Sequence, residues 1–222
     1  MSEMLQSGAS ATHAARMDRM YRTQRHFYDL TRKYYLFGRD TMIAELDAPA
    51  GGTVLEVGCG TGRNLDLIGR RFPSARLFGL DISAEMLVSA EKKLNRPGRP
   101  QAVLNVADAT DFDPKTFGTN GFDRIVISYA LSMIPNWEKA IDAAIAALNP
   151  GGSLHIADFG QQERLPAFFR RGLHGWLNRF HVMPRRSMAD AMQKRAQASG
   201  DHLTFRALGR GYAWLFVYRR KA

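Results

Sequence analysis

The sequence contains one cysteine, Cys59, in 222 residues, and it has no apolar run long enough to cross a bilayer, which takes about 20 residues. A single cysteine excludes an intramolecular disulfide and a multi-cysteine zinc site, and we predict no metal ligands. Residues 1–11 include the acidic Glu3 and no apolar segment follows them, so no secretion signal is predicted. These features favour a reducing, cytoplasmic compartment and a protein that is soluble or peripheral to a membrane.

Acidic residues are also few. The sequence has 21 Asp and Glu against 31 Lys and Arg, which gives a formal net charge of +10. A balance this basic favours a negatively charged partner or surface. With 45% hydrophobic and 23% charged residues, the composition excludes a disordered or collagen-like chain. It is typical of one globular domain, which we predict over residues 1–222.

Hydrophobic periodicity predicts the order of helices and strands. Apolar residues at helical spacing predict a helix over residues 21–46, within an N-terminal helical cap at residues 1–48. The two periods then alternate through a core at residues 49–222. Helices are expected at 64–71, 83–94 and 137–148, and strands at 53–57, 76–80, 102–106, 122–127 and 153–157.

The C-terminal end departs from this alternation. Residues 202–207 and 212–218 are two strand-like runs separated only by residues 208–211, which predicts an antiparallel hairpin. Strands and helices that alternate with short connections form a parallel sheet with helices on both faces. The sequence therefore predicts an α/β fold: a Rossmann-like, doubly wound, seven-stranded sheet with a C-terminal antiparallel hairpin.

A glycine-rich loop follows the first expected strand, with Gly58, Gly60 and Gly62 in the pattern Gly-x-Gly-x-Gly. This differs from the Gly-x-Gly-x-x-Gly of dinucleotide enzymes, so a pyrophosphate is not the obvious ligand. Asp81 closes the next strand 19 residues after Gly62, where a carboxylate can accept both hydroxyls of a ribose. Asp108 follows the third strand and can meet an adenine amino group. A plainer interpretation is that the loop is only a turn and that Asp81 caps the following helix.

Five segments together favour the ligand interpretation. They are Val54-Leu-Glu-Val-Gly-Cys-Gly-Thr-Gly62, Gly79-Leu-Asp-Ile-Ser83, Ala107-Asp-Ala109, Phe122-Asp-Arg-Ile-Val126 and Leu148-Asn-Pro-Gly-Gly-Ser-Leu154. In this order and at these intervals the chain resembles the class I S-adenosylmethionine-dependent methyltransferases, from residue 53 to about residue 159 and again in the terminal hairpin.

The resemblance implies S-adenosylmethionine as cofactor. In the family the glycine loop supports the methionine part, the acid that matches Asp81 holds the ribose, and the positions that match Asp108 and Ala109 meet the adenine. Cys59 is expected to be a small loop residue and not a nucleophile. The cofactor-binding residues implied within the core are Glu56, Gly58, Cys59, Gly60, Thr61, Gly62, Asn64, Asp81, Ile82, Met86, Asp108, Ala109 and Ser128.

Two nucleic-acid activities are disfavoured. Methyltransferases of base amines usually carry Asn or Asp, two prolines and an aromatic residue after the fourth strand, where this chain reads Ser128-Tyr-Ala-Leu-Ser-Met133. Methylation of pyrimidine carbon 5 typically needs a cysteine nucleophile, and Cys59 lies in the cofactor loop. The positive charge does not decide the matter, because phosphates and anionic membranes both attract arginine. We predict that nucleic acid is not the substrate.

Residues 160–190 form a basic amphipathic insertion before the hairpin. Between residues 164 and 186 the apolar side chains Leu165, Phe168, Phe169, Leu173, Trp176, Leu177 and Phe180 follow helical steps, accompanied by Arg170, Arg171, Arg179, Arg185 and Arg186. This pattern is typical of a helix at a membrane interface. It also fits a lid that packs over a substrate pocket, and both roles can coexist. We predict an anionic membrane surface as the partner of residues 164–186, at the inner face of the cytoplasmic membrane, and no obligate protein partner.

Two N-terminal segments, residues 13–21 and 24–40, resemble the bacterial diacylglycerylhomoserine N-methyltransferases, which complete betaine lipid synthesis. That resemblance implies three successive methylations of the homoserine amine. Tyr28 and Arg39 are then expected to fold over the cofactor, with Arg39 facing its carboxylate.

The expected catalytic residues come from type and position. Tyr21, Tyr35 and Tyr129 are candidates for lining the amine pocket, since aromatic faces stabilise a developing positive charge, and Asp158 is a candidate for orienting the amine. His155 lies inside an expected strand and is interpreted as structural. The alternatives are a phosphatidylethanolamine N-methyltransferase, a methyltransferase of a soluble small molecule, and a non-enzymatic adaptor that binds RNA or a partner.

Overall fold

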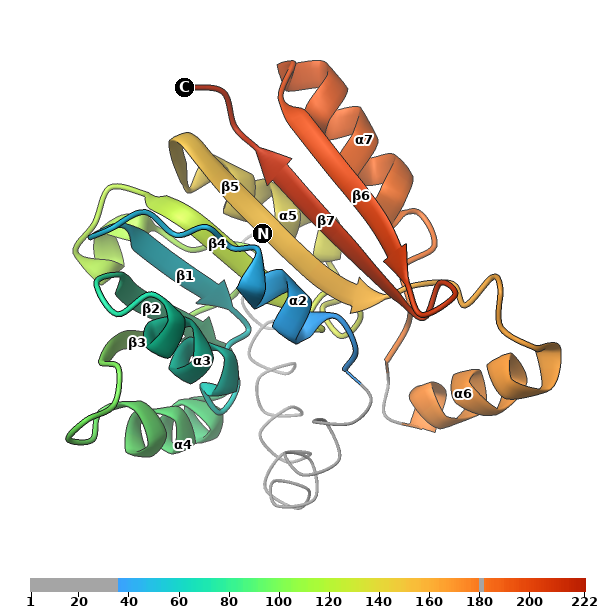
Figure 1. Ribbon diagram of the computed structural model, residues 1–222, viewed down its shortest axis with the longest axis horizontal. Helices are drawn as coiled ribbons and strands as arrows, with labels where there is room; N and C mark the ends of the chain where they lie inside the picture. Colours follow the sequence, from blue (N-terminus) through green and yellow to red (C-terminus); the bar gives the residue numbers. More distant parts are fainter. Residues whose placement is uncertain (1–35, 180–181) are drawn as a thin grey trace, which may run out of the picture.

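The computed structural model describes residues 36–179 and 182–222. Its centre is a seven-stranded sheet in the order β3-β2-β1-β4-β5-β7-β6 (Figure 1). Strands β1 to β5 are mutually parallel, and β7 runs antiparallel to both β5 and β6. The expected α/β fold with a terminal antiparallel hairpin is confirmed. The strands are β1 (Thr53–Val57), β2 (Arg76–Asp81), β3 (Ala102–Val106), β4 (Phe122–Ser128), β5 (Leu148–Phe159), β6 (His202–Leu208) and β7 (Ala213–Arg219).

Helices cover both faces of the sheet. They are α2 (Arg39–Ala44), α3 (Arg63–Arg71), α4 (Ala84–Leu94), α5 (Trp137–Ala146), α6 (Ala167–Arg179) and α7 (Met188–Ser199), with a short 3₁₀ helix η1 at Pro114–Phe117. Apolar residues of α2, α3 and α4 share one buried cluster with one face of the sheet. Residues of α5 and α7 share a second cluster with the opposite face. Every residue of β1 is buried, because the strand lies between these two layers.

The prediction of one continuous helix over residues 21–46 is wrong. Residues 37 and 38 form a turn, and α2 begins only at Arg39. Gly38 has a φ of 87°, in the left-handed region that interrupts a helix. It also approaches the hairpin closely, since a Cβ there would lie 3.1 Å from Leu208 Cδ1. The remainder of the expected helix lies outside the described residues.

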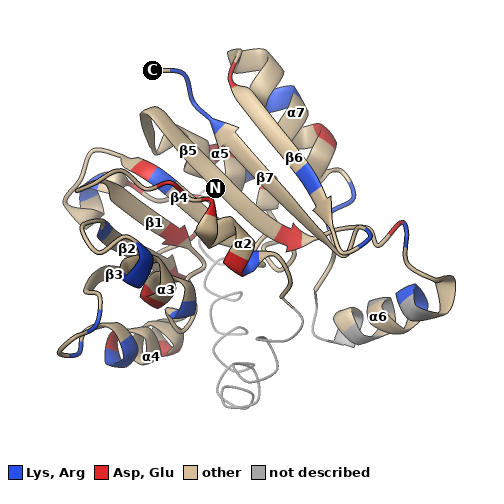
Figure 2. Cartoon of the chain, in the orientation of Figure 1, with Lys and Arg blue, Asp and Glu red and all other residues tan. Residues whose placement is uncertain are grey.

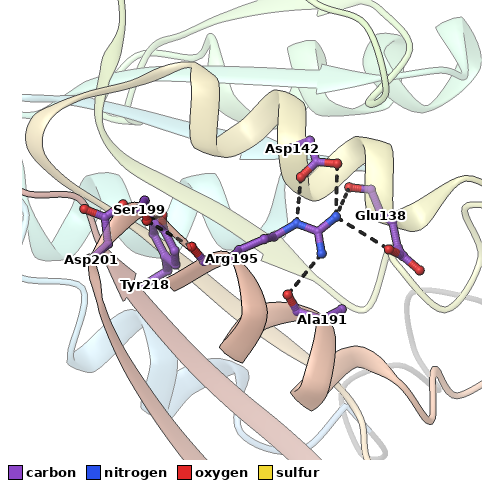
Figure 3. Close-up of polar contacts among 7 residues, drawn as sticks. All are labelled: Glu138, Asp142, Ala191, Arg195, Ser199, Asp201 and Tyr218. Atoms are coloured by element: carbon purple, nitrogen blue, oxygen red, sulfur yellow. Dashed lines mark hydrogen bonds and ion pairs between the residues drawn. The ribbon is translucent and has the colours of Figure 1, made fainter. Parts of the chain in front are cut away.

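Helix α7 was not expected from the sequence, and charged contacts fasten it to α5 (Figure 3). Arg195 Nε donates to Asp142 Oδ1 at 2.6 Å, and its Nη2 donates to Asp142 Oδ2 at 3.0 Å. At the end of α7, the Ser199 and Tyr218 hydroxyls lie 2.9 Å apart. The helical signal is weak because its buried residues are two methionines and two alanines among polar neighbours, namely Met188, Ala191, Met192 and Ala196.

The parallel topology fixes where a site can form. Five strands end at one edge of the sheet, which we call the carboxyl edge, and the loops that follow them meet there. The turn between β6 and β7 and the chain that leads into α6 lie at the same edge (Figure 1). No helix in the described part of the chain is long and apolar enough to span a membrane.

Candidate active site

The glycine loop after β1 folds over the end of β2. The backbone N–H groups of Gly58 and Cys59 both donate to the Leu80 carbonyl, at 2.8 and 2.9 Å. Gly58, Gly60 and Gly62 have φ values of 70°, 54° and 73°, which only glycine adopts without strain. A Cβ added at Gly60 would meet no atom within 4 Å. The loop backbone is therefore open to a ligand at Gly60, whereas Gly58 and Gly62 pack closely against Ala130 and Leu94.

Asp81, the last residue of β2, holds the loop in place. Its Oδ2 accepts the Gly60 N–H at 2.8 Å, and its Oδ1 accepts the Ser83 N–H at 2.9 Å. The N-cap of α4 is Ser83, whose hydroxyl accepts the Met86 N–H at 3.4 Å, so Asp81 is not the helix cap. Each carboxylate oxygen has two acceptor positions. Asp81 can therefore bind ribose hydroxyls while it keeps both backbone contacts.

The acid after β3 is fixed by its own loop. Asp108 Oδ1 accepts both the N–H and the hydroxyl of Thr110, at 2.9 and 2.8 Å. Ala109 beside it is buried. After the neighbouring strand β2, Ile82 is half-buried, and Met86 of α4 is buried. The residues expected to hold an adenosine thus lie at the ends of the adjacent strands β2 and β3.

The start of α3 is tied to β1 by a buried side-chain contact. Asn64 Nδ2 donates to Glu56 Oε1 at 2.7 Å, and both residues are buried. Thr61 accepts a hydrogen bond from Lys93 Nζ at 3.3 Å. Burial, reinforced by the charges of Asp81 and Glu56, raises the pKa of Cys59. A neutral thiol is a poor nucleophile, which agrees with a packing role in the loop.

Asp158, near the end of β5, is fully buried. Its Oδ1 accepts the Phe159 N–H at 2.7 Å and its Oδ2 accepts the Ser132 N–H at 3.1 Å. Burial raises the pKa of Asp158 to about 6, because a charged carboxylate is costly away from water. A carboxylate whose pKa lies this near neutrality can exchange a proton with a substrate.

Tyr129 follows β4 with a φ of 55°, an unusual backbone conformation for a non-glycine residue. Its hydroxyl donates to the Phe37 carbonyl, and its ring packs edge-on against Phe159 with centroids 4.7 Å apart. Burial raises the pKa of Tyr129 well above its ordinary value, so the phenol is neutral. The hydroxyl is committed to the backbone, while an aromatic role at the amine stays a prediction.

The other expected site residues are placed as follows. Ser128 is buried at the end of β4, between the glycine loop and Asp158. Arg39 is buried in α2, and its charge acts on Tyr129. His155 is buried within β5, where burial lowers its pKa to about 3 and Ser153 Oγ lies 2.9 Å from its Nε2, as befits a structural residue. Tyr21, Tyr28 and Tyr35 lie outside the described residues.

Arg185 was expected on the exposed basic face, and that expectation is wrong. Its guanidinium is half-buried and donates to two backbone carbonyls, Leu131 at 3.0 Å and Ile134 at 2.6 Å. Ser132, within this loop, was also missed. Nothing in the sequence distinguishes Arg185 from the exposed Arg186, because the contact depends on how the chain returns after α6.

The carboxyl edge therefore combines two kinds of region. Open glycine backbone and two anchored carboxylates line β1 to β3, and these residues fit an adenosyl cofactor. The hydroxyl of Ser128 is buried without a hydrogen-bond partner in the described part of the chain, a polar group that a ligand can satisfy. A buried carboxylate lies further along, at the end of β5.

Comparison with known proteins agrees with this geometry. Residues 54–152 match the family model described as a methyltransferase domain. The chain is 35% identical over 115 residues to a trans-aconitate 2-methyltransferase of Variovorax paradoxus, covering 52% of this chain and 41% of that protein. It is 32% identical over 117 residues to a phosphatidylethanolamine N-methyltransferase of Cereibacter sphaeroides, covering 52% and 55%. The chain thus spans about half the length of these curated relatives.

Solved structures show the same fold at low identity. The plantazolicin methyltransferase BpumL, in complex with a desmethylPZN analogue and SAH, superimposes over 100% of both chains with a TM-score of 0.69 and 13% identity. The DhpI-SAM-HEP complex matches 91% of this chain and 94% of its own, with a TM-score of 0.63 and 22% identity. The chain therefore has the fold of these methyltransferase structures, and its residues 54–152 match the model of a methyltransferase domain.

Proposed function

We propose that the protein methylates the amine of a lipid head group, and specifically the homoserine amine of diacylglycerylhomoserine. Up to three transfers would give the trimethyl betaine lipid. The observation that carries the proposal is α6, an exposed basic helix that leaves the carboxyl edge beside the candidate active site. We propose accordingly that the protein works at the inner face of the cytoplasmic membrane, with an anionic membrane surface as its partner.

Helix α6 has the composition and the position of an interfacial helix. In Figure 1 it extends away from the sheet, beyond the end of β5, and its Leu177 is buried in the cluster that α2, α3 and α4 share with the sheet. Phe168 is 77% exposed. Figure 2 shows basic and no acidic residues on its described surface, and residues 164–186 contain six arginines and no Asp or Glu. Exposed aromatic and basic residues together favour an anionic lipid interface.

The chemistry asks little of the protein. S-adenosylmethionine, when bound, supplies a methyl group that is already activated for transfer. The chain must align an unprotonated amine and exclude water. Asp158, whose pKa is about 6, is mostly a carboxylate at neutral pH, so it can accept a hydrogen bond or a proton from the amine. Its fully buried position strengthens that interaction.

The relatives support the reaction type unequally. The Cereibacter sphaeroides relative is named for a lipid amine substrate, which favours a head-group amine here. The trans-aconitate methyltransferases match over 115 residues, about half of this chain. Phosphatidylethanolamine is the second candidate, because its head group offers the same kind of amine and the chemistry would be identical.

A transfer assay tests the proposal. Purified full-length protein and labelled S-adenosylmethionine are incubated with phosphatidylglycerol vesicles that contain diacylglycerylhomoserine or phosphatidylethanolamine, or with soluble trans-aconitate. Lipids are then separated by chromatography. Label in mono-, di- and trimethylated homoserine lipid is the expected result. Label in phosphatidylethanolamine alone would change the head group, and label in trans-aconitate alone would contradict a lipid substrate.

Vesicle sedimentation tests the membrane partner separately. We expect binding to phosphatidylglycerol vesicles that weakens with salt, and much weaker binding to phosphatidylcholine. Replacing the exposed Arg170 and Arg171 by Gln is expected to cost about 1 kcal/mol for each arginine. A matched control is Arg70→Gln and Arg99→Gln, since these exposed arginines pair with Asp66. Equal binding by both double variants would refute a membrane role for α6.

A further inference from the structure

The chain that leaves α6 returns to the active-site edge and contacts the loop after β4. Leu177 of α6 accepts the Val182 N–H at 3.1 Å. The next residue, Met183, donates its N–H to the Ser132 carbonyl at 3.0 Å. Two residues later, Arg185 reaches the carbonyls on either side of Ser132, those of Leu131 and Ile134. We call residues 182–185 the return segment.

The loop at residues 131–134 is therefore held from two sides. The return segment contacts the carbonyls of its residues 131, 132 and 134. On the other side, the Ser132 N–H donates to Asp158. Ser132 thus connects the return segment with the buried carboxylate: its carbonyl accepts from Met183 and its N–H donates to Asp158.

Charge favours the same arrangement. Burial lowers the pKa of Arg185, and the charge of Asp158 offsets part of that effect. The groups that act on Asp158 include the Arg185 charge and the two backbone N–H donors of Phe159 and Ser132, and Asp158 in turn acts on the neutral Tyr129 phenol. A planar guanidinium can hold two carbonyls and still face a carboxylate, which an ammonium group cannot do with the same geometry.

We infer that Arg185 is a positioning residue for methyl transfer, which fixes the loop at residues 131–134 against Asp158 and connects that loop to α6. It acts through Asp158 and the loop, without touching the reacting atoms. The inference rests on the proposed function for its substrate and for the role of α6. The contact itself does not depend on which substrate is methylated.

Two substitutions separate charge from geometry. Arg185→Gln removes the positive charge, so the pKa of Asp158 should rise, because an opposite charge nearby favours the carboxylate. The acid limb of kcat/KM then moves to higher pH, and kcat falls. Arg185→Lys keeps the charge and loses the forked contact, so kcat should fall while the acid limb stays in place. If Arg185 had only a structural role, Arg185→Gln and Arg185→Lys would not differ in the position of the acid limb.

Arg195→Gln is the matched control. Arg195 also makes forked contacts, but with Asp142 on α5 and not at the carboxyl edge (Figure 3). This variant should unfold at a lower temperature and keep the wild-type pH profile. If it shifts the acid limb as far as Arg185→Gln does, or if both Arg185 variants match the wild type, the positioning role is refuted.

A second measurement needs no substrate. The carboxyl ¹³C resonance of Asp158 reports its pKa directly, and Asp158→Asn identifies that resonance. A higher pKa in Arg185→Gln, with no change in Arg195→Gln, supports the inference even if no lipid is methylated. An unchanged pKa in folded Arg185→Gln overturns it. Absence of lipid methylation with the expected pKa shift would reject the proposed function alone.

Discussion

Asp123 and Asp158 lie at opposite edges of the same sheet, and their surroundings differ. At the edge where the parallel strands begin, Asp123 accepts hydrogen bonds from the Thr53 N–H, the Thr53 hydroxyl and Asn149 Nδ2, at 2.8, 3.0 and 2.9 Å. At the carboxyl edge, Asp158 is fully buried and accepts two backbone N–H groups. Burial opposes the charge of both, but the hydrogen bonds outweigh burial only at Asp123, whose pKa is lowered, while the pKa of Asp158 is raised.

The difference distinguishes a residue that stabilises the fold from one suited to chemistry. Three donors around Asp123 join the starts of β1, β4 and β5, so its charge contributes to folding. Asp158 is charged at a cost to stability, as is common for functional groups. At the edge where the parallel strands begin, the charge of Asp123 thus stabilises the fold. At the edge where they end, the buried charge of Asp158 destabilises it.

The substitution Asp158→Asn should produce the largest effect, a loss of catalytic rate. An amide cannot accept a proton from the amine, and positioned acid–base groups contribute about 10²–10⁴-fold to rate. We expect kcat for methyl transfer to fall by about 10²-fold with unchanged cofactor affinity, as measured by steady-state kinetics and calorimetry. Asp123→Asn serves as the control and should keep wild-type kcat. Full activity of Asp158→Asn would remove Asp158 from the catalytic residues.

Asp81→Ala should produce the next largest effect, on cofactor binding. It loses the carboxylate that orders Gly60 and Ser83 and that we expect to hold the ribose. Charge-assisted hydrogen bonds contribute about 1.5–3 kcal/mol each, so loss of about 3 kcal/mol would weaken binding of S-adenosylhomocysteine roughly 100-fold. Calorimetry measures it, with Asp66→Ala as control, because Asp66 pairs only with arginines of the described chain. Wild-type affinity in Asp81→Ala would contradict the assignment.

Although Asp158→Asn should lower kcat, it should raise the free energy of unfolding at pH 8. The folded pKa of about 6 lies above the ordinary value of 3.8, so the contribution of Asp158 to stability is full below about pH 4 and is lost as pH rises through 6. The asparagine variant escapes this cost, of order 3 kcal/mol, and loses about 1 kcal/mol for one backbone acceptor. Urea unfolding should therefore show a gain of about 2 kcal/mol at pH 8 and a loss of about 1 kcal/mol at pH 4, where only the lost acceptor counts. A variant less stable than the wild type at pH 8 would contradict the buried-charge interpretation.

Asp123→Ala should have the smallest effect and the opposite pH dependence. The lowered pKa of Asp123 means that its contribution is present above pH 3.8 and is lost as pH falls through the folded pKa. We expect a loss of about 1–2 kcal/mol at pH 7 that closes in acid, with kcat unchanged. Urea unfolding at several pH values measures it. A large change in kcat would show that the two edges are not functionally separate.

Local patterns predicted the sheet and the glycine loop because those features depend on short stretches of chain. Alternating apolar runs located all seven strands within a few residues, apart from the longer β5, which begins at Leu148 and includes Pro150. The spacing of Gly62 and Asp81 predicted that the glycine loop and the acid lie together, and Asp81 accepts the Gly60 N–H. The sequence could not predict the break at Gly38, because a glycine within an amphipathic stretch interrupts it only where the tertiary contact with Leu208 requires it.

The candidate site was less predictable on the β5 side. Asp158 and Tyr129 were expected at the strand ends and lie there. Their environments, a buried carboxylate with a raised pKa and a buried phenol that donates to the Phe37 carbonyl, come from packing. Arg185 was misassigned for the same reason, since six arginines of one segment look alike until the return segment brings one of them inside.

The strand order has a consequence for how this architecture can diversify. The core residues expected to hold the cofactor come from β1 to β4 and the loops and helices beside them, while Asp158, α6 and the hairpin belong to the chain from β5 onward. Within the sheet the two portions meet along one strand pair, β4 with β5. Outside the sheet, Asp142 of α5 pairs with Arg195 of α7, and Glu45 pairs with Arg206 of the hairpin. A recombination event that exchanged everything after β4 would replace the residues that we expect to bind the acceptor and retain those that we expect to bind the methyl donor. Chimeras joined within residues 129–147 are therefore suited to combining the expected donor-binding residues of this chain with a different acceptor specificity.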